Sequence, residues 1–175
     1  MSMMMTLKEE DIDAPEKRGK FTIAVMGCGR MGLPTACLFA ETGFKVIGAD
    51  ANPIVIDLLR RGRAPFIEPG LKALIKKHTE GGSLTVTNNA KEAASASDVI
   101  VFVIPTLVDP KKKPDYSHVE RACKEVGMGL RSGSLVIFES TAVPGVTETL
   151  VKETLENVSG LKAGIDFGLA YSPIR

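Results

Sequence analysis

The chain has 175 residues, which is the length of about one domain. Lys and Arg together number 22 and Asp and Glu 21, so the formal net charge of +1 gives no electrostatic argument for binding nucleic acid or an anionic membrane surface. Hydrophobic residues make up 44% of the chain and charged residues 25%, a globular composition that excludes a wholly disordered protein.

Cysteine content and the N-terminal region narrow the class further. Cys28, Cys37 and Cys123 have neither the even number nor the spacing typical of a disulfide framework or a zinc site. We therefore expect free thiols, no bound metal and a reducing, cytoplasmic setting. The sequence contains no stretch of the roughly 18 apolar residues that a membrane span needs. Residues 1–20 are rich in charge and predict a flexible tail, with an interaction segment as the alternative.

Strand-like and helix-like segments alternate from residue 21 onward. Short apolar runs rich in β-branched residues predict strands over 21–27, 44–50, 83–87, 98–104, 134–140 and 167–173. Helical patterns and capping signals predict helices over 30–42, 52–62, 68–79, 89–96, 115–131 and 145–157. This alternation predicts an α/β fold. We expect residues 21–175 to form a single Rossmann-like domain, with a doubly wound, mostly parallel sheet and helices on both faces.

A glycine-rich turn follows the first predicted strand. Gly27, Gly29 and Gly32 fit the pattern G-x-G-x-x-G, and Asp50 ends the next strand near the usual spacing of about 20 residues. The first glycine permits a tight turn, the second lets backbone N–H groups approach a pyrophosphate, and the third lets the helix pack close to the strand. The helix N-terminus favours an anion, while Asp50 would bind ribose hydroxyls and repel a 2′-phosphate. The pattern predicts NAD rather than NADP; a turn without a cofactor is the alternative.

The other side chains of this turn have several candidate roles. Arg30 either reinforces the pyrophosphate site or faces solvent, and we count it with Met31 among the cofactor-binding residues. Cys28 lies near a helix N-terminus, which can lower a thiol pKa, so a redox role is conceivable. We favour a small side chain that fits a tight loop. Cys37 and Cys123 fall in helical patterns and are expected in the core.

Two further features are weaker signals. Lys111, Lys112 and Lys113 stand between two prolines and predict a solvated loop, with attraction of a sugar diphosphate as the alternative. His118 falls early in a predicted helix without a second histidine or a cysteine at ligand spacing, so we expect no metal site there.

Several motifs go beyond those of a general dinucleotide-binding domain. In chain order they are GCGRMGLP (27–34), APFIEPGL (64–71), IPT (104–106), PDYSHVE (114–120), ESTAVPG (139–145) and YSPIR (171–175). In this order they closely resemble the N-terminal domain of the UDP-glucose/GDP-mannose dehydrogenase family, the nucleotide-sugar dehydrogenases. The resemblance covers nearly all of the predicted domain.

The resemblance implies an oxidoreductase of polysaccharide biosynthesis, which oxidises the primary alcohol of a nucleotide-linked sugar, such as a UDP-sugar, to a carboxylate with two NAD in succession. It also implies that the turn containing Pro105 and Thr106 lines the cofactor. Thr141, in the pair Ser140–Thr141, matches a threonine near the reacting sugar that helps to hold a catalytic water. A hydroxyl both donates and accepts hydrogen bonds, so it can orient water. The alternative is that one of the pair caps the following helix.

The chain departs from the family pattern at Ile174, where a glutamate is usual, and at Arg30, where an aromatic or aliphatic residue is usual. In the family, the catalytic cysteine and a dimerising helix lie in later segments, and none of the cysteines here matches that nucleophile. Covalent catalysis needs a positioned thiolate. We therefore expect the chain alone to bind NAD without turnover and to be a monomer or weak dimer, whereas the whole enzyme is implied to be a homodimer acting on a nucleotide sugar.

Two other interpretations stay open at this point. One is a stand-alone dinucleotide-binding or sensor module. The other is an NAD-dependent dehydrogenase domain of the β-hydroxyacid type, which shares the glycine-rich turn but not the motifs EPGL, PDYSHVE and ESTAVPG.

Overall fold

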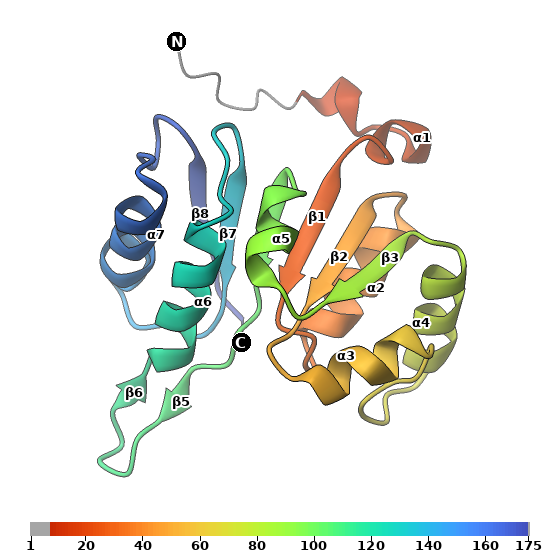
Figure 1. The fold of residues 1–175 in the computed structure, drawn as a ribbon, viewed down its shortest axis with the longest axis horizontal. Helices are drawn as coiled ribbons and strands as arrows, with labels where there is room; N and C mark the ends of the chain where they lie inside the picture. Colours follow the sequence, from red (N-terminus) through yellow and green to blue (C-terminus); the bar gives the residue numbers. More distant parts are fainter. Residues whose placement is uncertain (1–7, 175) are drawn as a thin grey trace.

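The computed structural model describes residues 8–174. Six parallel strands form one sheet in the order β3-β2-β1-β4-β7-β8 (Figure 1). They are β1 (Thr22–Met26), β2 (Lys45–Ala49), β3 (Leu84–Thr87), β4 (Val99–Phe102), β7 (Leu135–Glu139) and β8 (Gly168–Ser172). The strand order reverses between β1 and β4, and doubly wound sheets bind their ligands at this point. The predicted Rossmann-like α/β fold is confirmed.

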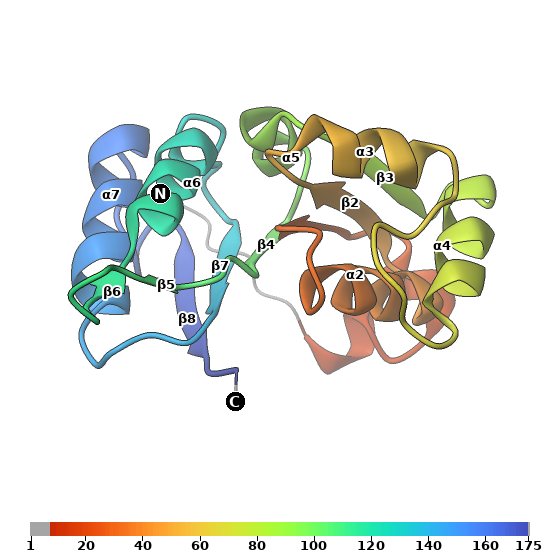
Figure 2. The ribbon, with the colours of Figure 1, turned by 90° about the horizontal axis from the view of Figure 1, so that it is seen from below.

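Helices cover both faces of the sheet. They are α2 (Gly32–Glu41), α3 (Pro53–Arg60), α4 (Leu71–Glu80), α5 (Ala90–Ser95), α6 (Ser117–Gly127) and α7 (Lys152–Ser159), the last preceded by a π-helical turn (Thr147–Val151). Seen from the carboxyl ends of the strands, α5, α6 and α7 lie on one side and α2 on the other (Figure 2). Within residues 8–174, no helix is both long and apolar enough to cross a membrane.

Alternate residues of the central strands supply two hydrophobic cores. On β1, Ile23 and Val25 pack toward α2 and α4, whereas Ala24 and Met26 pack toward α5 and α6. Successive side chains of a strand point to opposite faces, so a strand buried on both faces reads as a continuous apolar run. This is why the strands were predictable. The largest fully buried side chains are Phe102, Phe138, Phe167, Leu33, Leu59 and Ile75.

A hairpin that was not predicted projects from the body of the domain (Figure 1). Its strands, β5 (Leu107–Val108) and β6 (Pro114–Asp115), pair antiparallel and are too short for hydrophobic periodicity to indicate them. The exposed lysines 111–113 form its turn. One carboxylate oxygen of Asp109 accepts hydrogen bonds from the backbone N–H groups of residues 111 and 113, each at 2.8 Å. The predicted lysine loop is therefore an ordered turn.

Residues 8–20 fall in the predicted flexible tail and form two short helical turns, Glu9–Asp11 and α1 (Pro15–Arg18). The Arg18 guanidinium donates to the carbonyl of Thr42 at 3.1 Å, just after the end of α2. Specific contacts thus attach this segment to the domain, which its charge-rich composition does not reveal. Residues 1–7 of the predicted tail lie outside the described residues.

Two isoleucines on neighbouring helices test the core. Ile75 of α4 is fully buried, whereas Ile54 of α3 is 68% exposed. We expect Ile75→Ala to lower the free energy of unfolding by about 2–5 kcal/mol, because it leaves a cavity in a packed core. The matched control Ile54→Ala should change it by less than about 0.5 kcal/mol. Equal effects of the two variants in urea denaturation would contradict this arrangement of the core.

Candidate functional site

A cavity of about 320 Å³ opens at the carboxyl edge of the sheet, which Figure 2 faces. Its walls come from the glycine-rich loop after β1, the end of β2, the turns after β3 and β4, and one face of α6. The cavity thus lies where the strand order reverses. Its volume falls at the lower end of the range typical of small-molecule sites.

The three glycines of the loop meet different surroundings. Gly27 has a φ of +104°, and a β-carbon there would overlap the carbonyl oxygen of Val103. A β-carbon at Gly32 would overlap the carbonyl oxygen of Gly27, so this glycine permits close packing of α2 on the loop. Gly29 instead borders open space: apart from its two chain neighbours, no residue between 8 and 174 has an atom within 4 Å of a β-carbon built on it. A bare backbone is therefore presented to the cavity at Gly29.

The start of α2 carries unpaired backbone donors. Among the residues that the structure describes, the backbone N–H groups of Arg30, Met31 and Gly32 donate no hydrogen bond. Unpaired N–H groups and the helix dipole together give a helix start a partial positive charge. Such a start favours an anion, and a pyrophosphate is the anion that the bare backbone at Gly29 admits.

Asp50 connects the end of β2 to this loop. One oxygen of its carboxylate accepts a hydrogen bond from the backbone N–H of Cys28, and the other accepts one from the N–H of Asn52, both at 2.8 Å. An ionised carboxylate has about four acceptor positions, so two of them stay available to a ligand. The carboxylate lines the cavity and is fixed in place by bonds on both of its oxygens.

The Arg30 side chain makes a contact that neither of its expected roles includes. Its guanidinium carbon lies 5.4 Å from the centroid of the Phe66 ring, on the connection between α3 and α4. A guanidinium over an aromatic face is held by the ring quadrupole. The glycine-rich loop and the motif APFIEPGL are therefore in contact, although they are far apart in the sequence.

A cluster of hydroxyl groups joins the ends of β4, β7 and β8. The Thr106 hydroxyl donates to the carbonyl of Thr141 at 2.6 Å, and the Ser140 hydroxyl donates to the carbonyl of Ile104 at 2.8 Å. The Thr141 hydroxyl donates to the carbonyl of Ile174 at 3.2 Å. Three motifs of the resemblance thus meet at the carboxyl edge of the sheet.

Two tyrosines hold the same segment. The Tyr171 hydroxyl donates to the carbonyl of Ser140 at 3.1 Å, and the Tyr116 hydroxyl accepts from the N–H of Val143 at 3.0 Å. The π-helical turn that begins at Thr147 has no side-chain cap. The alternative in which one hydroxyl of the pair 140–141 caps this helix is therefore wrong.

The predicted site residues fall into two neighbouring groups. Those that line the cavity are Gly27, Gly29, Asp50 and Pro105. Those that do not line it are Arg30, Met31, Gly32, Thr106, Ser140 and Thr141. Ile104 connects the groups, because it lines the cavity and its carbonyl accepts a hydrogen bond from the Ser140 hydroxyl.

The three cysteines are free thiols with buried side chains. Burial raises the pKa of the Cys28 thiol well above its usual range, and the nearby Asp50 carboxylate acts in the same direction. The lowered pKa considered for this residue is therefore wrong. Burial also raises the pKa of Cys37 to about 11 and that of Cys123 to about 12. All three thiols stay protonated near neutral pH and do not line the cavity.

One wall of the cavity was missed by the sequence analysis. His118, Arg121 and Glu125 line it from α6, at positions that share one face of a helix. Their spacing was visible in the sequence, but only the fold shows that this face borders the cavity. Within residues 8–174, no group of three or more His, Cys, Asp or Glu side chains is placed to hold a metal ion.

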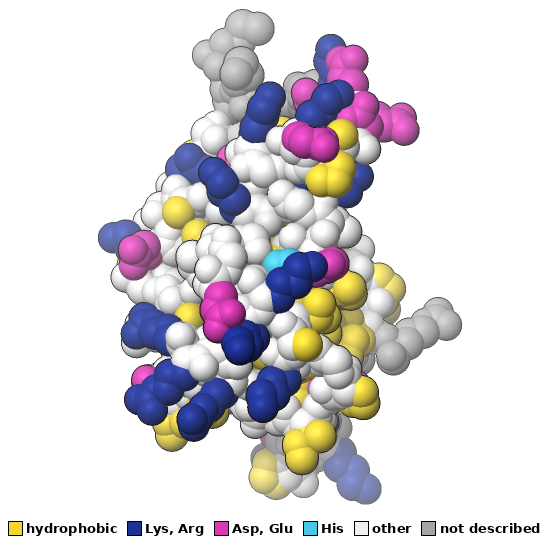
Figure 3. Space-filling model, turned by 90° about the vertical axis from the view of Figure 1, so that its right-hand side faces the viewer, with side chains coloured by type: hydrophobic (Ala, Val, Ile, Leu, Met, Phe, Trp, Pro, Cys, Tyr) yellow, Lys and Arg dark blue, Asp and Glu magenta, His cyan; other side chains and the backbone are white. Residues whose placement is uncertain are grey.

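Lysine and arginine side chains gather away from the cavity, over α3 and α4 (Figure 3). Several of them are paired: Arg61 lies 2.9 Å from Asp57, and Lys77 lies 2.6 Å from Glu41. Because these ion pairs are exposed, we interpret this basic region as a solvated helical surface.

Comparison with known proteins identifies the family. Residues 21–175 match the model of the UDP-glucose/GDP-mannose dehydrogenase family, NAD binding domain. The chain is 39% identical over 153 residues to UDP-N-acetyl-D-mannosamine dehydrogenase of Pyrococcus horikoshii, an alignment that covers 87% of this chain and 36% of that protein. It is 36% identical over 154 residues to GDP-mannose 6-dehydrogenase of Pseudomonas aeruginosa, with coverage of 86% and 35%.

A solved structure gives the same result. The crystal structure of NDP-N-acetyl-D-galactosaminuronic acid dehydrogenase from Methanosarcina mazei has a TM-score of 0.84 and 37% identity, over 99% of this chain and 38% of that one. The chain thus spans little more than a third of the length of the relatives it matches. The family model matches nearly the whole chain, and the fold and the glycine-rich loop agree with that match. The chain therefore belongs to the UDP-glucose/GDP-mannose dehydrogenase family and corresponds to its NAD-binding domain.

Proposed function

We propose that this chain is the NAD-binding part of a nucleotide-sugar dehydrogenase, which oxidises the primary alcohol of the sugar to a carboxylate with two NAD in succession. The observation that carries the proposal is the glycine-rich loop, fixed to Asp50 and open to a cavity at the strand-order reversal. The substrate class is supported by relatives named as dehydrogenases of UDP- and GDP-linked sugars. The family match favours this proposal over a β-hydroxyacid dehydrogenase.

The residues at the carboxyl edge fit NAD, whose nicotinamide accepts a hydride from the substrate when the cofactor is bound. The unpaired N–H groups at the start of α2 would bind the pyrophosphate beside Gly29, where a side chain would occupy the space that it needs. The two free acceptor positions of Asp50 would bind the ribose hydroxyls. The proposed cofactor-binding residues are Gly27, Gly29, Arg30, Met31, Gly32, Asp50, Pro105, Thr106, Ser140 and Thr141.

Thr141 is the proposed catalytic residue of this part of the enzyme, in the role of holding a water near the reacting sugar. Its hydroxyl donates to the carbonyl of Ile174, which leaves the oxygen free to accept a hydrogen bond from water. The Ile174 position thus contributes a backbone carbonyl here, although its side chain lacks the carboxylate usual in the family.

We further propose that the 175-residue chain alone binds NAD without turning over substrate. Nucleophilic catalysis by cysteine needs a thiolate, whereas all three thiols are buried with raised pKa values, and none of them lines the cavity. We also propose a homodimer for the whole enzyme, a monomer or weak dimer for this chain, and a cytoplasmic location, which free thiols favour.

Calorimetric titration of the chain with NAD, NADH and NADP, with parallel assays on UDP- and GDP-sugars and on a 3-hydroxy acid, tests the proposal. We expect NAD and NADH to bind more tightly than NADP, and no NADH to form. Formation of NADH with the hydroxy acid, or no binding of any dinucleotide, would contradict it. Continuation of the reading frame past residue 175 into a cysteine-containing segment would support the enzyme, whereas a stop codon would support a stand-alone module.

Asp50→Ala tests the ribose site. We expect NAD affinity to fall roughly 10- to 100-fold, because a hydrogen bond to a charged group contributes about 1.5–3 kcal/mol, and the preference for NAD over NADP to narrow. The control Asp57→Ala removes a carboxylate from the exposed pair with Arg61 and should leave both affinities unchanged. Unchanged affinities in Asp50→Ala would remove this carboxylate from the site.

A further inference from the structure

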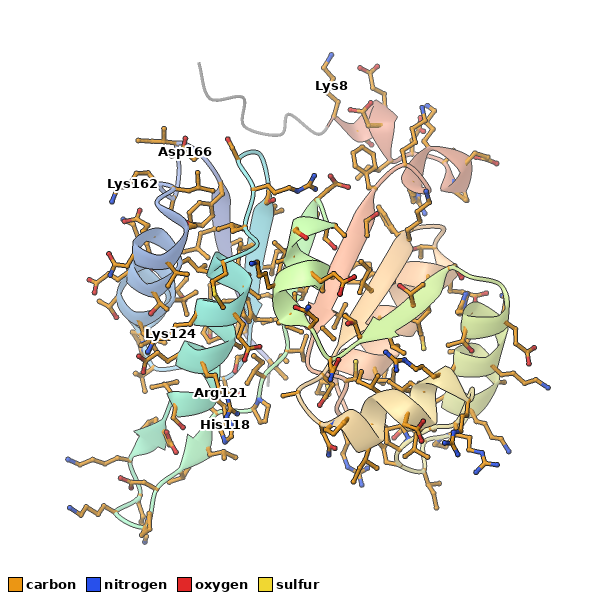
Figure 4. The ribbon with its side chains drawn as sticks, in the orientation of Figure 1. Lys8, His118, Arg121, Lys124, Lys162 and Asp166 are labelled. Atoms are coloured by element: carbon orange, nitrogen blue, oxygen red, sulfur yellow. The ribbon has the colours of Figure 1, made fainter. Side chains whose placement is uncertain are left out.

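The helix α6 has one apolar face and one polar face. The apolar face enters the core through Val119, Cys123 and Val126. The polar face lines the cavity with His118, Arg121 and Glu125. His118 and Arg121 lie close together at the lower end of α6 (Figure 4), where the guanidinium is 2.9 Å from the imidazole Nδ1. The function proposed above leaves this wall without a role.

The position of the base in a bound dinucleotide follows from the other groups of the site. The glycine-rich loop takes the pyrophosphate and Asp50 takes the adenosine ribose. The base is attached to the ribose on the side away from the pyrophosphate, so it lies beyond Asp50. The cavity that Asp50 lines is also lined by the small residues Ala51 and Ala90 and, on α6, by Ala122. Small side chains of this kind leave room for a planar base between the carboxyl edge of the sheet and α6, both of which line the cavity.

Glu125 is the carboxylate that α6 contributes to the cavity wall. It is half-buried and, within residues 8–174, makes no hydrogen bond or ion pair. Glu120 on the same helix differs, because it pairs with Lys124 at 2.6 Å outside the cavity. A partly desolvated carboxylate without a partner loses hydration that only a donor can replace. An ionised carboxylate only accepts hydrogen bonds, and the 6-amino group is the donor that the adenine ring offers.

We propose that Glu125 determines the base specificity of the site by accepting a hydrogen bond from the 6-amino group of adenine, and that Arg121, held by His118, lies against the face of the ring. The inference rests on the proposed function, because the base is placed from the pyrophosphate and ribose positions. Hypoxanthine carries an oxygen where adenine carries the amino group. That oxygen would face the carboxylate and be repelled.

Binding of NAD and of nicotinamide hypoxanthine dinucleotide to the chain tests the inference by calorimetry. We expect the unaltered chain to bind NAD about tenfold or more tightly than the hypoxanthine dinucleotide. Glu125→Gln should reduce this ratio of affinities by about tenfold, because the glutamine amide can donate a hydrogen bond to the oxygen of hypoxanthine. Arg121→Gln should weaken both dinucleotides alike, since stacking does not distinguish the two bases. The control Glu120→Gln, which removes a carboxylate from the other side of the same helix, should keep the full preference.

Glu125→Ala is a second, independent test. It should also reduce the ratio of the affinities for NAD and for the hypoxanthine dinucleotide. Both Glu125 variants should melt within a few degrees of the unaltered chain, because the side chain makes no internal hydrogen bond in the described structure. If the chain binds NAD but both variants retain the full preference for adenine, this inference is overturned while the proposed function stands. If the chain binds neither dinucleotide, this inference and the proposed function are both overturned.

Discussion

The site depends on the two hydrogen bonds that the Asp50 carboxylate accepts from the backbone. The carboxylate accepts one hydrogen bond from the backbone of the glycine-rich loop and another from the backbone that begins the next connection. Hydrogen bonds to an ionised acceptor are roughly twice as strong as neutral ones. The ends of β1 and β2 are thereby fixed relative to each other before any ligand arrives. This link also positions the features that would contact a ligand. They are the bare backbone at Gly29, the unpaired N–H donors of α2 and the remaining acceptor positions of the Asp50 carboxylate.

Around that link, the carboxyl edge divides into areas of different chemistry. The loop and the start of α2 offer N–H donors to an anion, and the far side of the cavity offers small side chains together with Arg121 and Glu125 of α6. Beyond β4, hydroxyl groups and backbone carbonyls from β4, β7 and β8 form a connected network. The Cys28 backbone belongs to the glycine-rich loop, but none of the three cysteines lines the cavity. This distribution is why we assign the chain a binding and orienting role and propose that the nucleophile comes from elsewhere in the enzyme.

The central features were predictable because their signals are local. A buried parallel strand is a continuous apolar run, and the loop glycines and Asp50 follow strand ends at a spacing set by one strand–helix–strand unit. Features that depend on tertiary contacts were not predictable. The sequence does not indicate that the Arg30 guanidinium lies over the Phe66 ring, or that the face of α6 with Glu125 borders the cavity. It also does not indicate that the Ser140 hydroxyl donates to the distant Ile104 carbonyl and does not cap a helix. The hairpin was missed because strands of two residues carry no period.

Nuclear magnetic resonance can locate the dinucleotide site residue by residue. The backbone amide signals of an isotope-labelled chain would be followed during addition of NAD. We expect the largest shifts on residues 28–32, on residues 50–52 and on the turn after β4, with little change over α3 and α4. Shifts centred on α3 and α4, or no shifts in the glycine-rich loop at saturating NAD, would contradict the claim that the Asp50-linked loop at the strand-order reversal is the dinucleotide site.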